Sequence, residues 1–142
     1  MAGFITAAGA SYLMGLAAMS VSRLDNYYLA LTLDVPTPIQ TSGELLELSN
    51  DDYIRSAIAA TDDNWVLEQN TLSNALEVTF PVCEADWDGI TGWALLDDPT
   101  DGEVLFGGDL GVPWTCPAGY QVVLTPGMLA VSIEVSPWEA SA

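Results

Sequence analysis

The feature that most constrains the fold of this chain is a series of short β-favouring runs with turn-forming residues between them. Each run is rich in β-branched, aromatic or leucine side chains, and clusters of Pro, Gly, Asp, Asn or Ser divide the runs. The runs cover residues 27–33, 53–58, 64–68, 75–80, 90–96, 103–106, 112–115, 120–124 and 129–135. Spacings of about 8 to 12 residues predict an all-β sandwich or barrel of about eight or nine strands.

An uncharged segment precedes these runs. No charged residue occurs from Phe4 to Val21, and Tyr12, Leu13, Leu16 and Met19 recur at helical spacing. Gly, Ala, Ser and Thr dilute the segment too much for a membrane span, and it lacks the basic start of a secretory signal. It therefore predicts a short helix that packs on the core or on a neighbouring subunit. We expect an N-terminal apolar helix or arm over residues 1–22 and a single β-sandwich domain over residues 23–142.

The charge balance excludes several classes of function. The chain has 142 residues, with 20 acidic and 2 basic residues, no Lys and no His, and a net charge of −18. Such a chain repels phosphate backbones, and it cannot supply a catalytic His, a His-bound zinc or a lysine Schiff base. We therefore expect no enzymatic activity, no cofactor, and no nucleic-acid or membrane partner. Half of the residues are hydrophobic, so the chain should fold with its acids outside and attach to partners where acids are missing.

The densest acidic cluster lies in the segment DDPTDGE, residues 97–103. Asp97, Asp98, Asp101 and Glu103 are weak candidates for a Ca²⁺ site, because carboxylates on a tight loop suit that ion. The spacing is not that of an EF-hand loop, since Pro99 would occupy a ligand position. Pro99 and the Asp101-Gly102 pair instead favour a solvated hairpin tip between two strands.

Aromatic side chains supply the candidates for subunit or capsid contact. They are Trp87, Trp93, Phe106 and Trp114, which form either a contact patch or the core beneath it. From the N-terminal helix, Tyr12, Leu13 and Leu16 join them as contact candidates. Asp86 and Asp88 flank Trp87 and superficially fit a sugar-hydrolysing pair of carboxylates, but Trp87 as a core or interface anchor is the favoured interpretation.

Two cysteines, Cys83 and Cys116, fit either a disulfide or a pair of buried thiols. The sequence does not place them within bonding reach of each other. The missing signal peptide favours free thiols made in a reducing cytoplasm.

Several motifs follow one another in a recognisable order. They are TAAGASYLMGLAAM, YYLALTLDVPTP, Gly43-Glu44, Tyr53-Ile54-Arg55, NALEVTFP, ADWDGITGW, LFGGDL and PAGYQVVLTPGMLAVSIEV. In this order, over residues 5–135, the chain resembles a family of small virion proteins of tailed bacteriophages, the tail-fibre-like or head-decoration proteins. Two departures are the DDPTDGE segment in place of a Gly-rich hairpin and a far more acidic composition.

The resemblance implies a jelly-roll-like β-sandwich that forms homotrimers on the outside of the virion. The leading hypothesis is a non-enzymatic decoration or cement protein on the capsid exterior, made in the host cytoplasm and bound to the major capsid protein. The alternative is a tail-tip or tail-fibre module that binds a host receptor and contacts other tail proteins.

Overall fold

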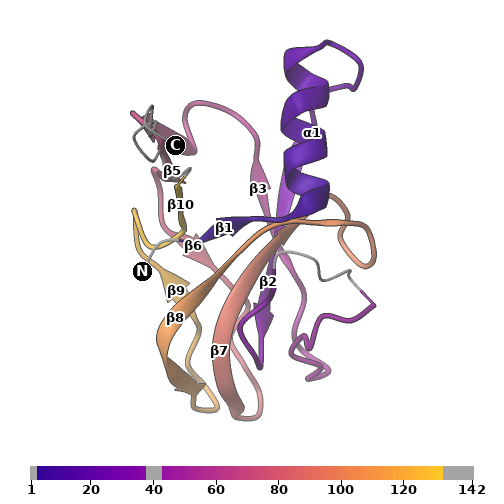
Figure 1. Cartoon of the computed structure of the whole chain (residues 1–142). Helices are drawn as coiled ribbons and strands as arrows, with labels where there is room; N and C mark the ends of the chain where they lie inside the picture. Colours follow the sequence, from indigo (N-terminus) through magenta and orange to yellow (C-terminus); the bar gives the residue numbers. More distant parts are fainter. Residues whose placement is uncertain (1–2, 38–42, 133–142) are drawn as a thin grey trace, which may run out of the picture.

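The computed structural model describes residues 3–37 and 43–132, which form one helix and ten strands (Figure 1). The helix is α1 (Ala7–Ala17). The strands are β1 (Phe4–Ile5), β2 (Asn26–Thr32), β3 (Ser56–Ala59), β4 (Trp65–Glu68), β5 (Thr71–Asn74), β6 (Val78–Thr79), β7 (Trp87–Leu96), β8 (Val104–Cys116), β9 (Val123–Leu124) and β10 (Ala130–Ser132). The described residues thus fold as an all-β sandwich with one short helix, which confirms the predicted fold class.

The largest sheet has five antiparallel strands in the order β1-β8-β7-β2-β3. Its centre is the long hairpin of β7 and β8, and the acidic segment 97–103 connects these two strands. Residues 92–96 of β7 are all buried, as expected for an apolar run that does not alternate with polar residues. This hairpin is the frame on which the N-terminal segment rests, because β1 pairs with β8 and α1 packs against it.

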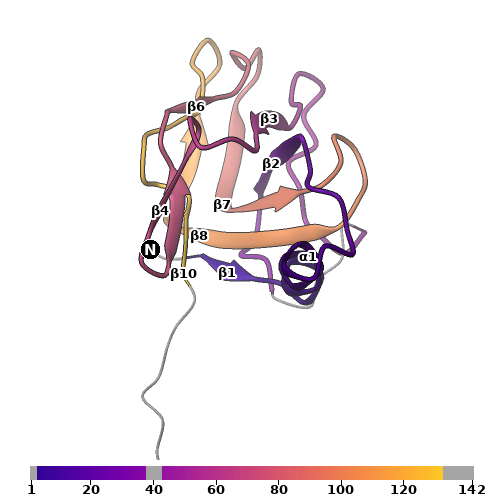
Figure 2. The same ribbon diagram turned by 90° about the horizontal axis from the view of Figure 1, so that it is seen from above.

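Two smaller antiparallel sheets complete the fold. One has the order β10-β5-β4, and the other consists of β6 and β9. Figure 2 shows β4 and β10 to one side of the long hairpin and α1 toward its other end. The core between these layers is built from aromatic and leucine side chains, the largest being Trp87, Trp93 and Phe80. No helix within residues 3–37 and 43–132 is long and apolar enough to cross a membrane.

Several strands differ from their predicted bounds. The runs predicted over 103–106 and 112–115 merge into one strand, β8, which begins at Val104, because Gly107 and Gly108 between them pair with β7. The short strands β1 and β5 were not predicted at all. Leu76 is exposed although Val78 and Phe80 are buried, since the regular strand begins only at Val78. In the predicted run 129–135, β10 covers Ala130–Ser132, and residues 133–135 lie outside the described residues.

Candidate functional site

The first turn of α1 is fixed to β8. Thr6 caps the helix: its hydroxyl accepts the N–H of Gly9 at 2.9 Å and also bonds to the carbonyl of Leu105 at 3.0 Å. Gly9 rests on β8, where an added Cβ would lie 2.0 Å from the Leu105 oxygen. Only glycine permits this approach, so the base of the helix has one position relative to the sheet.

The C-terminal end of α1 has an unusual cap. The Ser20 N–H donates to the carbonyl of Gly15 at 2.8 Å, and the Met19 N–H donates to the carbonyl of Leu16 at 3.1 Å. These two hydrogen bonds form a Schellman motif. This pattern puts Met19 in the left-handed region, at φ +57°, where glycine is the usual residue. The Met19 side chain is 90% exposed, so packing within the described chain does not account for a methionine there.

Met19 has apolar neighbours that are also exposed. Met14 is 73% exposed, and Val21 lies partly exposed over Gly15. We call Met14, Met19 and Val21 the helix tip. In Figure 1 this end of α1 stands clear of the sheets. Because no charged residue occurs from Phe4 to Val21, the helix tip is apolar surface on a protein that carries 20 acidic residues elsewhere.

An apolar hollow of about 260 Å³ lies beside the helix. We call it the side hollow; it is lined by Leu16, Tyr27, Trp65, Leu67 and Leu72, together with the charged residues Arg23 and Asp62. The Trp65 indole N–H donates to the carbonyl of Ala59 at 3.1 Å, and its ring meets Tyr27 edge-on with centroids 5.7 Å apart. These contacts fix the indole and keep the wall of the hollow in place.

The two arginines have different surroundings. The Arg55 guanidinium forms a two-pronged pair with Glu47 at 2.9 and 3.0 Å and donates to the carbonyls of Asp98 and Asp101, each at 2.8 Å. Its side chain is almost fully buried. Arg23, by contrast, is exposed at the side hollow and makes no ion pair with the described residues. Arg23 is therefore the arginine whose guanidinium remains accessible to a binding partner.

The acidic hairpin uses its carboxylates to hold its own turn. Asp98 accepts the N–H groups of Thr100 and Asp101 at 3.0 and 2.9 Å, and Asp97 accepts the N–H of Glu103 at 2.8 Å. The bonds from Asp101 and Thr100 hold the pKa of Asp98 below its ordinary value. No group of three or more metal-ligating side chains occurs among residues 3–37 and 43–132. The geometry is that of a hairpin tip that Arg55 ties to the body of the protein.

Three of the predicted contact residues lie in the core. Trp87, Trp93 and Phe106 have almost no exposed surface. The Trp87 indole N–H donates to Asp52 at 2.9 Å, and the Tyr53 ring meets the Trp87 ring edge-on at 5.8 Å. A side chain without exposed surface cannot touch a partner of the folded protein. Of the two roles considered for Trp87, Trp93 and Phe106, the core role is therefore the one that the structure supports.

The other predicted contact residues reach the surface in part. Tyr12, Leu13 and Leu16 are half-buried on α1, and the Tyr12 hydroxyl accepts the N–H of Leu24 at 3.0 Å. Trp114 is half-buried on β8 and lines a separate hollow. A contact role for these four residues stays a prediction.

The sequence interpretation did not include Met14, Met19 or the wall of the side hollow among the contact candidates. Nothing in the sequence marks position 19 as left-handed, because the usual signal there is glycine. The sequence indicates only a strand for Trp65 and Leu67, and their convergence with α1 depends on how the three-stranded sheet packs. The one available signal was the long uncharged segment, which predicted the helix α1.

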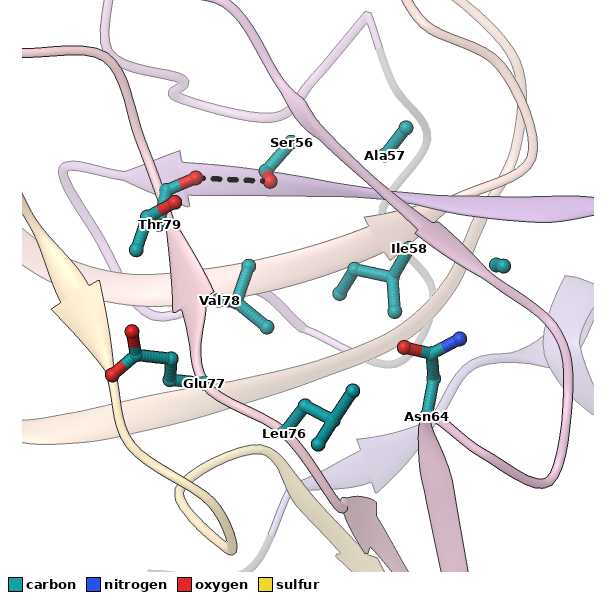
Figure 3. Close-up of a pocket in the computed structure, with 9 residues that line it drawn as sticks. Ser56, Ala57, Ile58, Asn64, Leu76, Glu77, Val78 and Thr79 are labelled. Atoms are coloured by element: carbon teal, nitrogen blue, oxygen red, sulfur yellow. Dashed lines mark hydrogen bonds between the residues drawn. The ribbon is translucent and has the colours of Figure 1, made fainter.

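A polar hollow of about 240 Å³ lies between β3 and β6 (Figure 3). Ser56 closes one end by donating to the carbonyl of Thr79 at 3.2 Å. Glu77 is the one titratable side chain among its lining residues, and Figure 3 shows its carboxylate turned away from Ile58. One carboxylate beside hydroxyl groups does not make an acid and base pair, so the helix tip and side hollow remain the better candidate for function.

Comparisons with known proteins place the chain in a family. No curated protein matches it. The family model described as Podophage GP4 fiber I protein gp80 matches residues 10–132, which include most of α1 and all strands from β2 to β10. The resemblance found from the ordered motifs is thereby confirmed at the level of phage virion proteins. The chain belongs to the family of the podophage GP4 fiber I protein gp80, a phage tail-fibre-like family, and is a structural component of a bacteriophage virion.

Proposed function

We propose that this chain is a non-enzymatic fibre subunit on the outer surface of a tailed-phage virion, and that it assembles as a homotrimer through α1. The observation that carries the proposal is Met19, an apolar side chain held almost fully exposed on backbone that favours glycine. A methionine that lowers the stability of the isolated chain is expected where it contacts a partner. The family's description as a fiber protein supports this role over decoration of the capsid.

Electrostatics restricts where two copies can meet. Each copy carries a net charge of −18, and exposed charges interact over about 8 Å at physiological salt. Most of the surface therefore repels a second copy. The helix tip adds no charge to a contact, and at the side hollow the exposed Arg23 offsets the charge of Asp62, so neither surface adds to the repulsion.

The helix tip and the side hollow are different surfaces of one chain, and both are apolar. A contact between the tip of one copy and the hollow of the next is head-to-tail, and such contacts form a closed ring when the rotation between copies closes. A ring of three is the state that the family resemblance implies. The partners of this assembly are other tail proteins, and we include neither nucleic acid nor membrane among them.

Capsid decoration, the leading hypothesis from the sequence, is the second candidate. The same uncharged helix suits docking on a capsid shell, because the major capsid protein also has to approach an acidic subunit. In the fibre role, the loops away from α1 are available to bind a host receptor. In the decoration role, the acidic loops face solvent and α1 faces the shell.

Copy number in purified virions separates the two roles. Isotope-labelled peptides of this chain and of the major capsid protein would be quantified together by mass spectrometry. A fibre subunit predicts a small number of copies per particle, with density at the tail in electron cryomicroscopy. Hundreds of copies per particle would contradict the fibre role and support decoration, and absence from washed particles would contradict both.

A further inference from the structure

Cys83 and Cys116 are neighbours in the core. Their Sγ atoms lie 3.3 Å apart, and both thiols are free. The two residues are 33 positions apart in the chain, and each is almost fully buried. The sequence could not place them together, because one follows β6 and the other ends β8.

Backbone pairing on both sides keeps the two cysteines together. The Cys83 N–H donates to the carbonyl of Tyr120 at 2.9 Å, and the Gly119 N–H donates to the carbonyl of Cys83 at 2.8 Å. Cys116 pairs in register with Trp87 at the open end of the β7–β8 hairpin. The contact between the sulfur atoms is therefore a product of the sheet framework and requires no movement of either strand.

We propose that Cys83 and Cys116 form a redox modification site, in which the dithiol of the newly made protein becomes an intramolecular disulfide in an oxidising medium. The co-reactant is a small aliphatic disulfide, such as oxidised glutathione. The inference does not depend on whether the chain is a fibre or a decoration protein. It requires only the contact between the two sulfur atoms and access for the oxidant.

Access is available from the side of Cys116. This residue lines an open hollow of about 350 Å³, together with Trp114, Pro117 and Tyr120. Cys83 does not line this hollow, and its thiol bonds to the carbonyl of Pro117 at 3.0 Å. Cys116 is therefore the first thiol to react, and Cys83 is the second.

The reaction balances as two thiol–disulfide exchanges. The Cys116 thiolate attacks one sulfur of oxidised glutathione, so a mixed disulfide forms and one glutathione thiolate leaves. The Cys83 thiolate then attacks the Cys116 sulfur, which forms the internal disulfide and releases the second glutathione. Two protein thiols are oxidised, one small disulfide is reduced, and the two thiol protons end on the two glutathione molecules.

Burial makes the first exchange slow at neutral pH. It raises the pKa of the Cys116 thiol to about 11, with smaller contributions from the Cys83 thiol and from the carboxylates of Asp86 and Asp52. Because the thiolate is the reactive form, the rate should rise roughly tenfold per pH unit between pH 7 and pH 9. The dithiol is thus kinetically protected during synthesis and closes on longer exposure.

The test is a thiol count on the purified full chain. Native protein would be incubated with oxidised or with reduced glutathione, denatured, alkylated with iodoacetamide and weighed by intact mass spectrometry. We expect two alkylated thiols after reduced glutathione and none after oxidised glutathione, with a peptide that links residues 83 and 116. The oxidised form should melt higher, by on the order of 10 °C.

Single variants test the order of the two steps. Cys83→Ala should stop at a stable glutathione adduct on Cys116, whereas Cys116→Ala should stay largely unmodified at Cys83. Equal adduct formation in the two variants would overturn the assigned order. Two free thiols in native wild-type protein after prolonged oxidation at pH 9 would overturn the proposal. Neither result bears on copy number in the virion, so a failure here is distinct from a failure of the proposed function.

Discussion

Gly9 of α1 lies directly against the main-chain carbonyl of Leu105 in β8, and a Cβ at position 9 would sit 2.0 Å from that oxygen. That carbonyl cannot easily move aside, because it already accepts the N–H and the hydroxyl of Thr6, each at 3.0 Å. Gly9→Ala should therefore lower the free energy of unfolding by about 2 to 3 kcal/mol, as overpacking against rigid structure does. Urea unfolding followed by tryptophan fluorescence would measure the loss.

Gly15→Ala is the matched control. A Cβ there meets the methyl groups of Val21 at 2.8 Å, and Val21 is a partly exposed side chain in a connecting loop. Alanine also has a higher helix propensity than glycine, by about 1 kcal/mol. Gly15→Ala should cost at least 1 kcal/mol less than Gly9→Ala, by the order of magnitude of these effects. Equal losses in the two variants would mean that α1 is not held by its first turn.

Met19→Gly should stabilise the isolated chain and weaken its association. Relief of the left-handed strain is worth about 1 kcal/mol, since glycine adopts this conformation without a steric penalty. Gln69→Gly is the control, because Gln69 is also exposed and has φ +54° in the β4–β5 turn. Both variants should unfold at higher urea concentration, and only Met19→Gly should lower the sedimenting mass. A loss of mass in both would assign the effect to backbone flexibility.

Arg55→Met should lower the free energy of unfolding by about 2 to 3 kcal/mol. The substitution leaves the Glu47 carboxylate without its cation and removes the donors to two hairpin carbonyls. The loss is at the low end for a broken ion pair because Glu47 keeps some contact with water. Arg23→Met makes the same chemical change at an exposed site and should stay within about 0.5 kcal/mol of wild type. Similar losses in both would contradict the structural role of Arg55.

Asp52 should contribute to the loss of stability in acid. Hydrogen bonds from the Glu84 N–H and the Trp87 indole hold the pKa of Asp52 below its ordinary value of 3.8. A carboxyl group whose folded-state pKa is lowered stabilises the protein above its unfolded pKa, and that contribution disappears as pH falls through the folded-state pKa. In Asp52→Asn, the fall in stability below about pH 4 should be shallower. Urea midpoints from pH 7 to pH 3, with Asp63→Asn as an exposed control, would measure the difference.

Much of the strand content could be predicted from the sequence because it depends on local patterns. The run 90–96 is apolar without interruption, and the structure places it in a central strand that is buried on both faces. The segment 97–103 connects β7 and β8, as Pro99 and Asp101-Gly102 indicated. Helix α1 (Ala7–Ala17) lies within the uncharged segment from Phe4 to Val21 that predicted a short helix.

The candidate site depended on information that no local pattern carries. Aromatic content alone did not tell a core tryptophan from a surface one, so Trp87 and Trp93 were considered for contacts although both are buried. The approach of Cys83 to Cys116 follows from pairing between segments distant in sequence. The left-handed conformation of Met19 follows from how the helix ends, which a methionine does not signal.

The central claim is that the helix tip forms the subunit contact, and native mass spectrometry of three proteins tests it most directly. They are the wild type, the double variant Met14→Asp/Met19→Asp, and the control Ile54→Asp/Val112→Asp. Ile54 and Val112 are 65% and 63% exposed, so the control adds the same charge at comparable apolar positions away from α1. We predict a wild-type mass of three times the 15.1 kDa chain, an unchanged trimer in the control, and a 15.1 kDa monomer in Met14→Asp/Met19→Asp. A wild-type monomer, or the same assembly in both double variants, would contradict the claim.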